Sequence, residues 1–152
     1  MPLVDDRRQQ VLDEAECRRL LATAVIGRLA YTEAALPAIA PVHFTVLDDE
    51  LLIPSRLDSS LTAATRGAVV AFQVDAYEQE TLDLPDCTGW SVSVVGPSHV
   101  ISDPDEVAAL DAAGGLPWYA GTHCYVVVRM GICRGRRIRA PRGTVDTADT
   151  PS

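Results

Sequence analysis

The residues best suited to hold a phosphate lie in one short segment. Ser59 and Ser60 stand at the predicted start of a short helix, and Arg56 comes just before them. A phosphate needs fixed donors, and the first turn of a helix supplies free backbone N–H groups and a favourable dipole. Serine is also a preferred residue at the start of a helix for purely structural reasons. The segment therefore predicts either an anion site or a well-capped helix.

A second group of candidate residues lies on a strand that carries two prolines, Pro37 and Pro41, followed by His43. Proline cannot donate to a strand ladder, so this strand has an edge, a bulge or a stretch that faces a ligand. A histidine there can donate a proton, bond to a ligand or bind haem. It can equally be a structural histidine. Its spacing from His99 and His123 does not indicate a three-histidine metal site.

Tryptophan and cysteine give weaker signals. Trp90 and Trp118 can stack on a flat cofactor, and they fit equally well in a core or at a dimer interface. The cysteines form no C-x-x-C pair and match no zinc finger or ribbon. We interpret them as reduced, small hydrophobic residues and predict no metal site. They are Cys17, Cys87, Cys124 and Cys133.

The charge distribution limits the possible partners. A formal net charge of −8 argues against a general nucleic-acid binder, because phosphate backbones attract a positive field. Arginines nevertheless gather near the C-terminus, where they indicate either a solvated edge strand and tail or a role facing an anion. These arginines are Arg129, Arg134, Arg136, Arg137, Arg139 and Arg142.

The length of 152 residues fits one domain. No apolar run is long enough for a membrane span, and the N-terminus lacks the order of a secretory signal, so we expect a cytoplasmic protein with no membrane partner. We predict an N-terminal extension over 1–12, one domain over 13–139 and a disordered tail over 140–152.

Strands dominate the elements that must position these residues. The chain predicts a helix over 13–24 capped by Asp13, a short helix over 59–66 capped by Asp58, and a helix that begins at Asp103–Pro104 and ends near Gly114. Strands are expected at 26–32, 36–47, 51–53, 68–75, 90–101 and 123–138, with a loop at 76–87 and an interruption at Gly96–Pro97. The tight connections predict a mainly β protein, an antiparallel barrel with helices at its ends.

Eight ordered segments of the chain, spanning about residues 13–138, resemble the pyridoxamine 5′-phosphate oxidase-like, FMN-binding split-barrel families. Each segment alone is a weak signal, whereas the ordered set is specific for the fold. The segments are 16–21 (ECRRLL), 27–30 (GRLA), 37–44 (PAIAPVHF), 59–61 (SSL), 70–75 (VAFQVD), 89–92 (GWSV) with Gly96, 117–118 (PW) and 135–138 (GRRI).

The resemblance implies an antiparallel split β-barrel of six or more strands with short flanking helices. It also implies a homodimer with the flavin in a groove between protomers. The strand containing Pro41, Val42, His43 and Phe44 would bind the flavin ring through backbone groups. Ser55, Arg56, Ser59 and Ser60 would hold the phosphate. Ser91 would approach the ring or the ribityl chain, and Trp118 and the basic C-terminal strand would close the site from the second protomer.

Two residues depart from the family pattern, and a third lies beside one of them. Ser60 stands where relatives carry lysine or arginine, Asp58 adds a negative charge beside it, and His43 replaces an asparagine. Losing a cation weakens a charge-assisted contact by about 1.5–3 kcal/mol, or roughly ten- to a hundredfold in affinity. Arg56, or a C-terminal arginine of the partner protomer, can compensate for that loss.

The resemblance favours an FMN-dependent oxidoreductase that acts on a small molecule, in which the cofactor performs the hydride chemistry and the protein orients it. It identifies no catalytic side chain. Three alternatives stay open: a reductase that uses the deazaflavin F420, a non-catalytic protein that binds flavin or haem, and a barrel without a cofactor that serves in a biosynthetic pathway.

Overall fold

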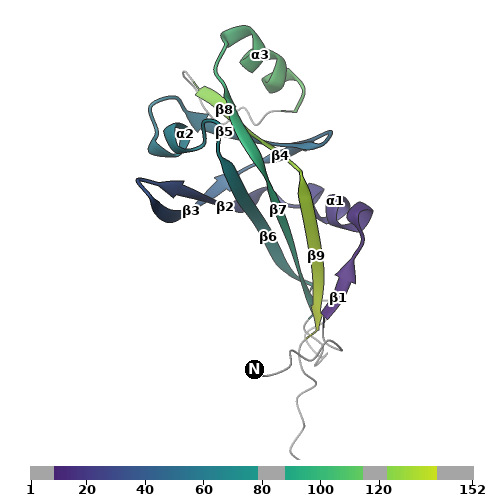
Figure 1. The fold of residues 1–152 in the computed structure, drawn as a ribbon. Coiled ribbons are helices and arrows are strands. Elements are labelled where there is room, and N and C mark those ends of the chain that lie inside the picture. The colour runs from purple at the N-terminus through teal and green to yellow at the C-terminus, as the bar shows by residue number, and fades with distance from the viewer. Residues whose placement is uncertain (1–8, 79–87, 115–122, 140–152) are drawn as a thin grey trace, which may run out of the picture.

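The computed structural model describes residues 9–78, 88–114 and 123–139. Within these ranges it shows three helices and nine strands (Figure 1). The helices are α1 (Glu14–Ala22), α2 (Ser60–Ala64) and α3 (Pro104–Ala112). The strands are β1 (Gln9–Leu12), β2 (Ile26–Glu33), β3 (Leu36–His43), β4 (Thr45–Leu47), β5 (Glu50–Arg56), β6 (Val69–Glu78), β7 (Thr88–Ile101), β8 (His123–Arg129) and β9 (Ile132–Arg139).

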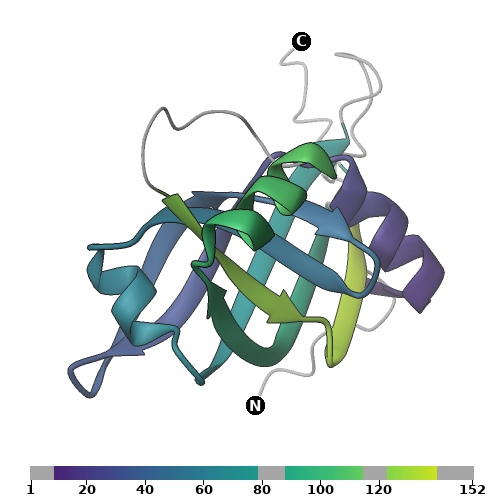
Figure 2. The same cartoon turned by 90° about the horizontal axis from the view of Figure 1, so that it is seen from above.

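The strands form an antiparallel sheet that curls on itself without closing. Neighbouring strands follow the order β3-β2-β6-β7-β8-β5-β4, and β9 pairs with both β7 and β1. Strands β3 and β4 therefore lie at the two ends of the main path. Helices α1 and α2 lie on opposite sides of the curled sheet, with α3 between them (Figure 2). The predicted split β-barrel with flanking helices is confirmed.

Strand β7 joins the two halves of the barrel. Its first part pairs with β9, from Thr88 to Val95, and its last part pairs with β8, from Ser98 to Ile101. Gly96 lies at the change of partner, where a Cβ atom would be 1.8 Å from the carbonyl oxygen of Arg129. We expected Gly96–Pro97 to interrupt the strand, and this prediction is wrong. Strand β7 continues through the pair, which marks the point where the strand changes partners.

The buried side chains form two apolar clusters. The larger, which we call the barrel cluster, fills the inside of the barrel around Leu29, Phe72 and Val92. The smaller, which we call the α3 cluster, lies beneath α3 and consists of Leu52, Val107, Tyr125 and Val127. Burying one such side chain stabilises the fold by about 1.5–3 kcal/mol. The two clusters hold opposite faces of the β5–β8 pair.

Side-chain caps start all three helices. The carboxylates of Asp13 and Asp103 accept backbone N–H bonds at the starts of α1 and α3, which confirms both predicted caps. The predicted cap at Asp58 is wrong. Ser59 caps α2 by accepting from the N–H of Thr62 at 3.1 Å, because the Asp58 carboxylate bonds to Arg56 instead.

Other boundaries also differ from expectation. The strand expected over 36–47 divides into β3 and β4, because β3 pairs with β2 whereas β4 pairs with β5. Strand β6 continues through Glu78 into the expected loop, since it stays paired with β7. Residues 9–12, expected in an N-terminal extension, form β1 against β9. Trp118, Cys87 and the expected tail lie outside the described residues.

No described helix has the length and apolar character that a membrane crossing requires; α1 and α3, the longest, have nine residues each.

Candidate functional site

Strand β3 has an open edge. Among the described strands only β2 pairs with it, in a register that runs from Leu36 opposite Glu33 to His43 opposite Ile26. A proline nitrogen cannot donate to a ladder, so Pro41 must direct its backbone away from β2. Alternation along the strand then directs the N–H and C=O of Ile39 to the same open edge. This edge offers the backbone donors and acceptors that the resemblance assigns to this strand.

The side chains of residues 41–44 alternate between two environments. Pro41 and His43 lie on the outer face of the sheet, whereas Val42 and Phe44 turn toward the barrel cluster. The Phe44 side chain is only 1% exposed and packs edge-on against Phe72, with ring centroids 4.7 Å apart. The Phe44 side chain is thus part of the core, and a ligand at β3 can meet the strand backbone and the outer side chains.

The hydroxyls predicted to bind phosphate meet at the start of α2, in what we call the hydroxyl cluster. The Ser55 hydroxyl lies 3.2 Å from that of Ser59 and 2.8 Å from that of Thr62. The Ser59 hydroxyl donates to Thr62, which in turn donates to the carbonyl of Arg56 at 2.7 Å. Ser60, the first residue of α2, is exposed. The structure therefore joins Ser55 and Ser59, and it adds Thr62, which the sequence analysis missed.

Arg56 does not join the hydroxyl cluster through its side chain. Adjacent residues of a strand point to opposite faces, so Arg56 projects away from Ser55. Its guanidinium bonds to the Asp58 carboxylate at 3.2 Å, and both side chains are nearly three-quarters exposed. An exposed ion pair of this kind contributes only about 0–1 kcal/mol. Arg56 can therefore leave Asp58 for another anion at little cost.

Ser91 belongs to a different surface, the outer face of the sheet formed by β3, β2, β6, β7 and β9. Its hydroxyl accepts a bond from the Gln73 amide at 3.1 Å, and it lies opposite Arg136 in the register of β7 and β9. On the same face Arg28 forms an ion pair with Asp75 at 2.7 Å. Ser91 therefore sits in a polar, charged part of the outer face and not beside Ser59.

A row of apolar side chains crosses the outer face next to these polar groups. Strand registers place one such residue on each of five neighbouring strands. Exposed fractions of 71% for Ile39 and 52% for Ile132 show that the row faces outward. A shallow pocket of about 120 Å³ lies over its β3 end. This apolar row consists of Ile39, Ala30, Ala71, Val95 and Ile132.

A polar cluster that the sequence analysis missed ties α3 to β8, and we call it the α3 clamp. The Asp111 carboxylate accepts a hydrogen bond from the Tyr125 hydroxyl and lies 2.9 Å from Nε2 of His123. The bond from Tyr125, and then that from His123, lowers the pKa of Asp111. Burial, followed by the bond to Asp111, raises the pKa of Tyr125. Nothing in the sequence spacing links His123 to Asp111.

The other singled-out aromatic and sulfur-bearing residues within the described ranges are structural. Trp90 is 5% exposed and belongs to the barrel cluster. Cys17 and Cys124 are buried, and burial raises the pKa of Cys133 to about 11 and that of Cys17 above its usual value. The Cys17 and Cys133 thiols therefore stay protonated at neutral pH and pack as hydrophobic residues. Within residues 9–78, 88–114 and 123–139 no His, Cys, Asp or Glu group could hold a metal ion.

Comparison with known proteins places this arrangement in a wider group. A family model described as pyridoxamine 5′-phosphate oxidase matches residues 13–131. The uncharacterized protein Rv0080 of Mycobacterium tuberculosis is 44% identical over 97 residues, which cover 64% of this chain and 64% of that protein. The matched part of this chain thus spans less than two thirds of that relative.

Solved structures show the same fold. The FAD binding protein from Mycobacterium smegmatis superposes with a TM-score of 0.73 at 28% identity, over 87% of this chain and all of that chain. An FAD-binding protein from Mesorhizobium loti superposes with a TM-score of 0.68 at 21% identity, over 88% of this chain and 99% of that one. The second similarity concerns the fold alone.

Proposed function

This chain belongs to the pyridoxamine 5′-phosphate oxidase family, and from that premise we propose that it binds a flavin nucleotide and acts as an oxidoreductase on a small molecule. The observation that carries the proposal is the open edge of β3, which the fold leaves unpaired by any described strand. A flavin is further supported by the similarity to the FAD binding protein from Mycobacterium smegmatis, at 28% sequence identity.

The residues of this chain fit a flavin at two points. The flavin ring carries alternating donors and acceptors along one edge, which match the backbone groups on the open edge of β3 near Pro41. A flavin phosphate needs donors, and the hydroxyls of Ser55 and Ser59 can rotate to supply them. Arg56 projects from the other face of β5, but it is the last residue of that strand. Once released from Asp58, its long, exposed side chain can turn around the strand end to supply a positive charge. A bound flavin would provide the hydride or electron transfer, and these residues would bind and orient it.

The described residues offer one cluster for a phosphate. Both FMN and FAD carry a phosphate at the end of the ribityl chain, so this cluster does not distinguish them. FMN is the smaller of the two nucleotides, and it carries both the ring and one phosphate. Chromatography of the cofactor released from the protein identifies which of the two is carried.

We propose that a second copy of the chain covers the outer face. The apolar row carries an exposed isoleucine or valine on three of its five strands and alanine on the other two, and such a patch is typical of an interaction surface. Replacing Ile39 with aspartate should convert a dimer to a monomer in light-scattering measurements of mass. The control is Leu36→Asp, which changes an exposed residue on the same strand but on the alternate face. A monomeric wild-type protein, or a dimer that survives I39D, would contradict this arrangement.

Titration with FMN and with riboflavin tests the flavin proposal, because the two differ only in the phosphate. We expect FMN to bind about tenfold or more tightly than riboflavin. Arg56→Ala should weaken FMN binding by roughly ten- to a hundredfold and leave riboflavin unchanged. Arg66→Ala is the matched control, since Arg66 is an exposed arginine near the other end of α2. Equal affinities for the two flavins would contradict the assigned phosphate contacts.

Anaerobic reduction of the bound flavin tests the proposed oxidoreductase function. The bound flavin should lose its visible absorption on anaerobic reduction, stay bound, and recover the absorption when an electron acceptor is added. Release of the cofactor on reduction would argue for a protein that only carries flavin.

A further inference from the structure

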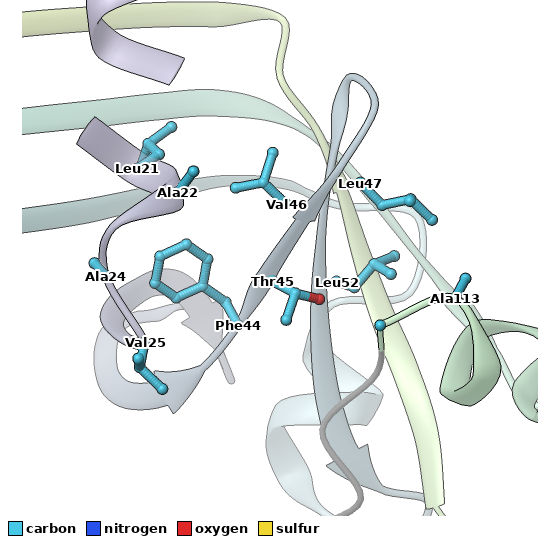
Figure 3. A pocket seen from close by; sticks show the side chains of 11 residues that line it. Leu21, Ala22, Ala24, Val25, Phe44, Thr45, Val46, Leu47, Leu52 and Ala113 are labelled. Carbon is cyan, nitrogen blue, oxygen red and sulfur yellow. The ribbon is translucent and has the colours of Figure 1, made fainter. Parts of the chain in front are cut away.

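A pocket of about 300 Å³ opens where the ends of α1 and α3 approach strand β4 (Figure 3). Its volume is at the lower end of the range for small-molecule sites. Figure 3 shows Leu21 and Ala22 on one side, Ala113 on the other, and the β4 side chains between them. This pocket is separate from both the open edge of β3 and the hydroxyl cluster.

The pocket lies at the seam between the two apolar clusters. Of the adjacent β4 residues, Val46 packs against the barrel cluster and Leu47 against the α3 cluster. The deepest lining side chains, Leu21, Phe44 and Leu52, are buried by one cluster or the other. Since these side chains are anchored by packing on their far sides, the walls of the pocket are formed by the fold itself.

The rim is built from small residues on both helices. Ala22 ends α1, and Ala113 and Gly114 follow α3. Val25, also in the lining, has 52% of its side chain exposed. A larger residue at Ala22 or Ala113 would cover the opening, so the small residues leave Val46 and Leu47 partly open to solvent.

The chemistry of the lining selects the ligand. None of the eleven lining residues carries an ionisable side chain, and the hydroxyl of Thr45 is the only polar side-chain group among them. The chain as a whole is 22% charged, so a site of this size without a charge departs from its average surface. Burying an ion here would leave it unpaired, at a large cost in free energy.

We propose that this pocket binds an uncharged, mainly apolar small molecule of up to about three aromatic rings. Apolar contact with Val25, Val46 and Leu47, the accessible apolar side chains of the lining, supplies the affinity. The Thr45 hydroxyl offers one hydrogen bond for orientation. The site does not depend on flavin binding, since its lining shares no side chain with the proposed phosphate contacts. Phe44, which the resemblance also assigns to the flavin ring, would meet that ring only through its backbone.

Two fluorescent probes with the same aromatic framework test the proposal. N-phenyl-1-naphthylamine is neutral, and 8-anilino-1-naphthalenesulfonate adds a sulfonate. Titrated into the full chain, the neutral probe should bind saturably and about tenfold or more tightly than the sulfonate, since the pocket offers no cation to pair with it. Equal or tighter binding of the sulfonate would overturn the proposal.

Blocking variants locate the binding. Ala22→Trp and Ala113→Trp should each weaken the neutral probe about tenfold or more by covering the rim from two different helices. Ala15→Trp and Ala108→Trp are matched controls on the same helices, because both alanines are exposed and lie outside the lining. Circular dichroism checks that all four variants fold. Binding that survives both blocking variants would overturn the site.

Absence of probe binding in the wild-type chain would also overturn the proposed pocket site. It would indicate that another part of the chain or a second copy covers the pocket. Flavin absorbance recorded in the same samples keeps the two proposals apart. Probe binding without flavin supports this site while counting against the proposed function, and flavin binding without probe binding does the reverse.

Discussion

The β5–β8 pair carries neutral hydroxyl groups on one face and ionisable groups on the other, and the change occurs between two adjacent residue pairs. Ser55 lies opposite Cys124 on the face that looks into the barrel, whereas Arg56 lies opposite His123 on the face covered by α3. The first face holds the hydroxyl cluster, which is neutral. The second holds the α3 clamp, which contains a carboxylate and a histidine. A single strand pair thus separates a cluster whose hydroxyls can turn to a ligand from one that ties a helix to the sheet.

The difference between the two clusters concerns energy and pH. Hydroxyl groups keep the same charge across the physiological range, so the hydroxyl cluster should be insensitive to pH. The α3 clamp depends on an ionised Asp111, whose pKa the bond from Tyr125 lowers. Substitutions on the two faces should therefore differ both in size and in how their effects change with pH.

The largest effect is expected for Tyr125→Phe, which removes the donor to Asp111. A buried hydrogen bond to a charged group contributes about 1.5–3 kcal/mol, and partial exposure of Asp111 favours the lower end. Urea denaturation measures the loss. Tyr77→Phe is the control, because Tyr77 is 88% exposed. A Y125F protein within about 0.5 kcal/mol of wild type would show that the clamp does not hold α3.

On the opposite face, Thr62→Val should cost about 0.5–1.5 kcal/mol of unfolding free energy, less than Tyr125→Phe, because its hydrogen bonds join neutral groups. Thr62 is fully buried, and its loss leaves the Arg56 carbonyl and two serine hydroxyls without their partner. Thr62→Ser keeps the hydroxyl and should recover most of that stability. Equal losses in T62V and T62S would assign the effect to the methyl group instead of the cluster.

Lowering the pH should affect the stability contributions of the two faces differently. Because the folded pKa of Asp111 lies below its ordinary value of 3.8, its contribution to stability is complete above about pH 4 and is lost as the pH falls through the lower folded pKa. The stability difference between wild type and Y125F should therefore shrink below pH 4, whereas that between wild type and T62V should stay constant. Denaturation curves at pH 7 and pH 3 give both differences. A Y125F difference that is the same at both pH values would contradict the clamp's ionic character.

The smallest effect on stability is expected for Asp58→Ala, which removes the exposed partner of Arg56. Unfolding free energy should change by less than about 0.5 kcal/mol. FMN affinity should rise by up to about fivefold, because the guanidinium no longer has to leave a carboxylate. Weaker FMN binding in D58A would mean that Asp58 positions Arg56 instead of competing for it.

Local patterns in the sequence were sufficient for most of the barrel. Caps at Asp13 and Asp103 and the short helix after Arg56 depend on residues three or four apart, which a sequence displays directly. The choice of Ser59 over Asp58 as the cap was missed because it depends on which side chain Arg56 engages. Strand β1 was missed because it has four residues and is held by a partner more than 120 positions away.

In the candidate site, too, contacts between residues close in sequence could be predicted, whereas contacts made by packing could not. Ser55 and Ser59 are close in sequence and meet in space, as the segment indicated. The link between Asp111 and Tyr125 could not be predicted, since a helix and a strand must first pack together to create it. Likewise, the pocket at the cluster seam arises from packing and has no signature in the spacing of its residues.

The visible absorption spectrum of the purified chain, after incubation with FMN or FAD and removal of the unbound cofactor, tests the central claim most directly. We predict a retained flavin spectrum at close to one flavin per chain. A colourless protein that no flavin reconstitutes would contradict it, and a retained Soret or deazaflavin band in the protein as purified would assign the open edge of β3 to a different cofactor.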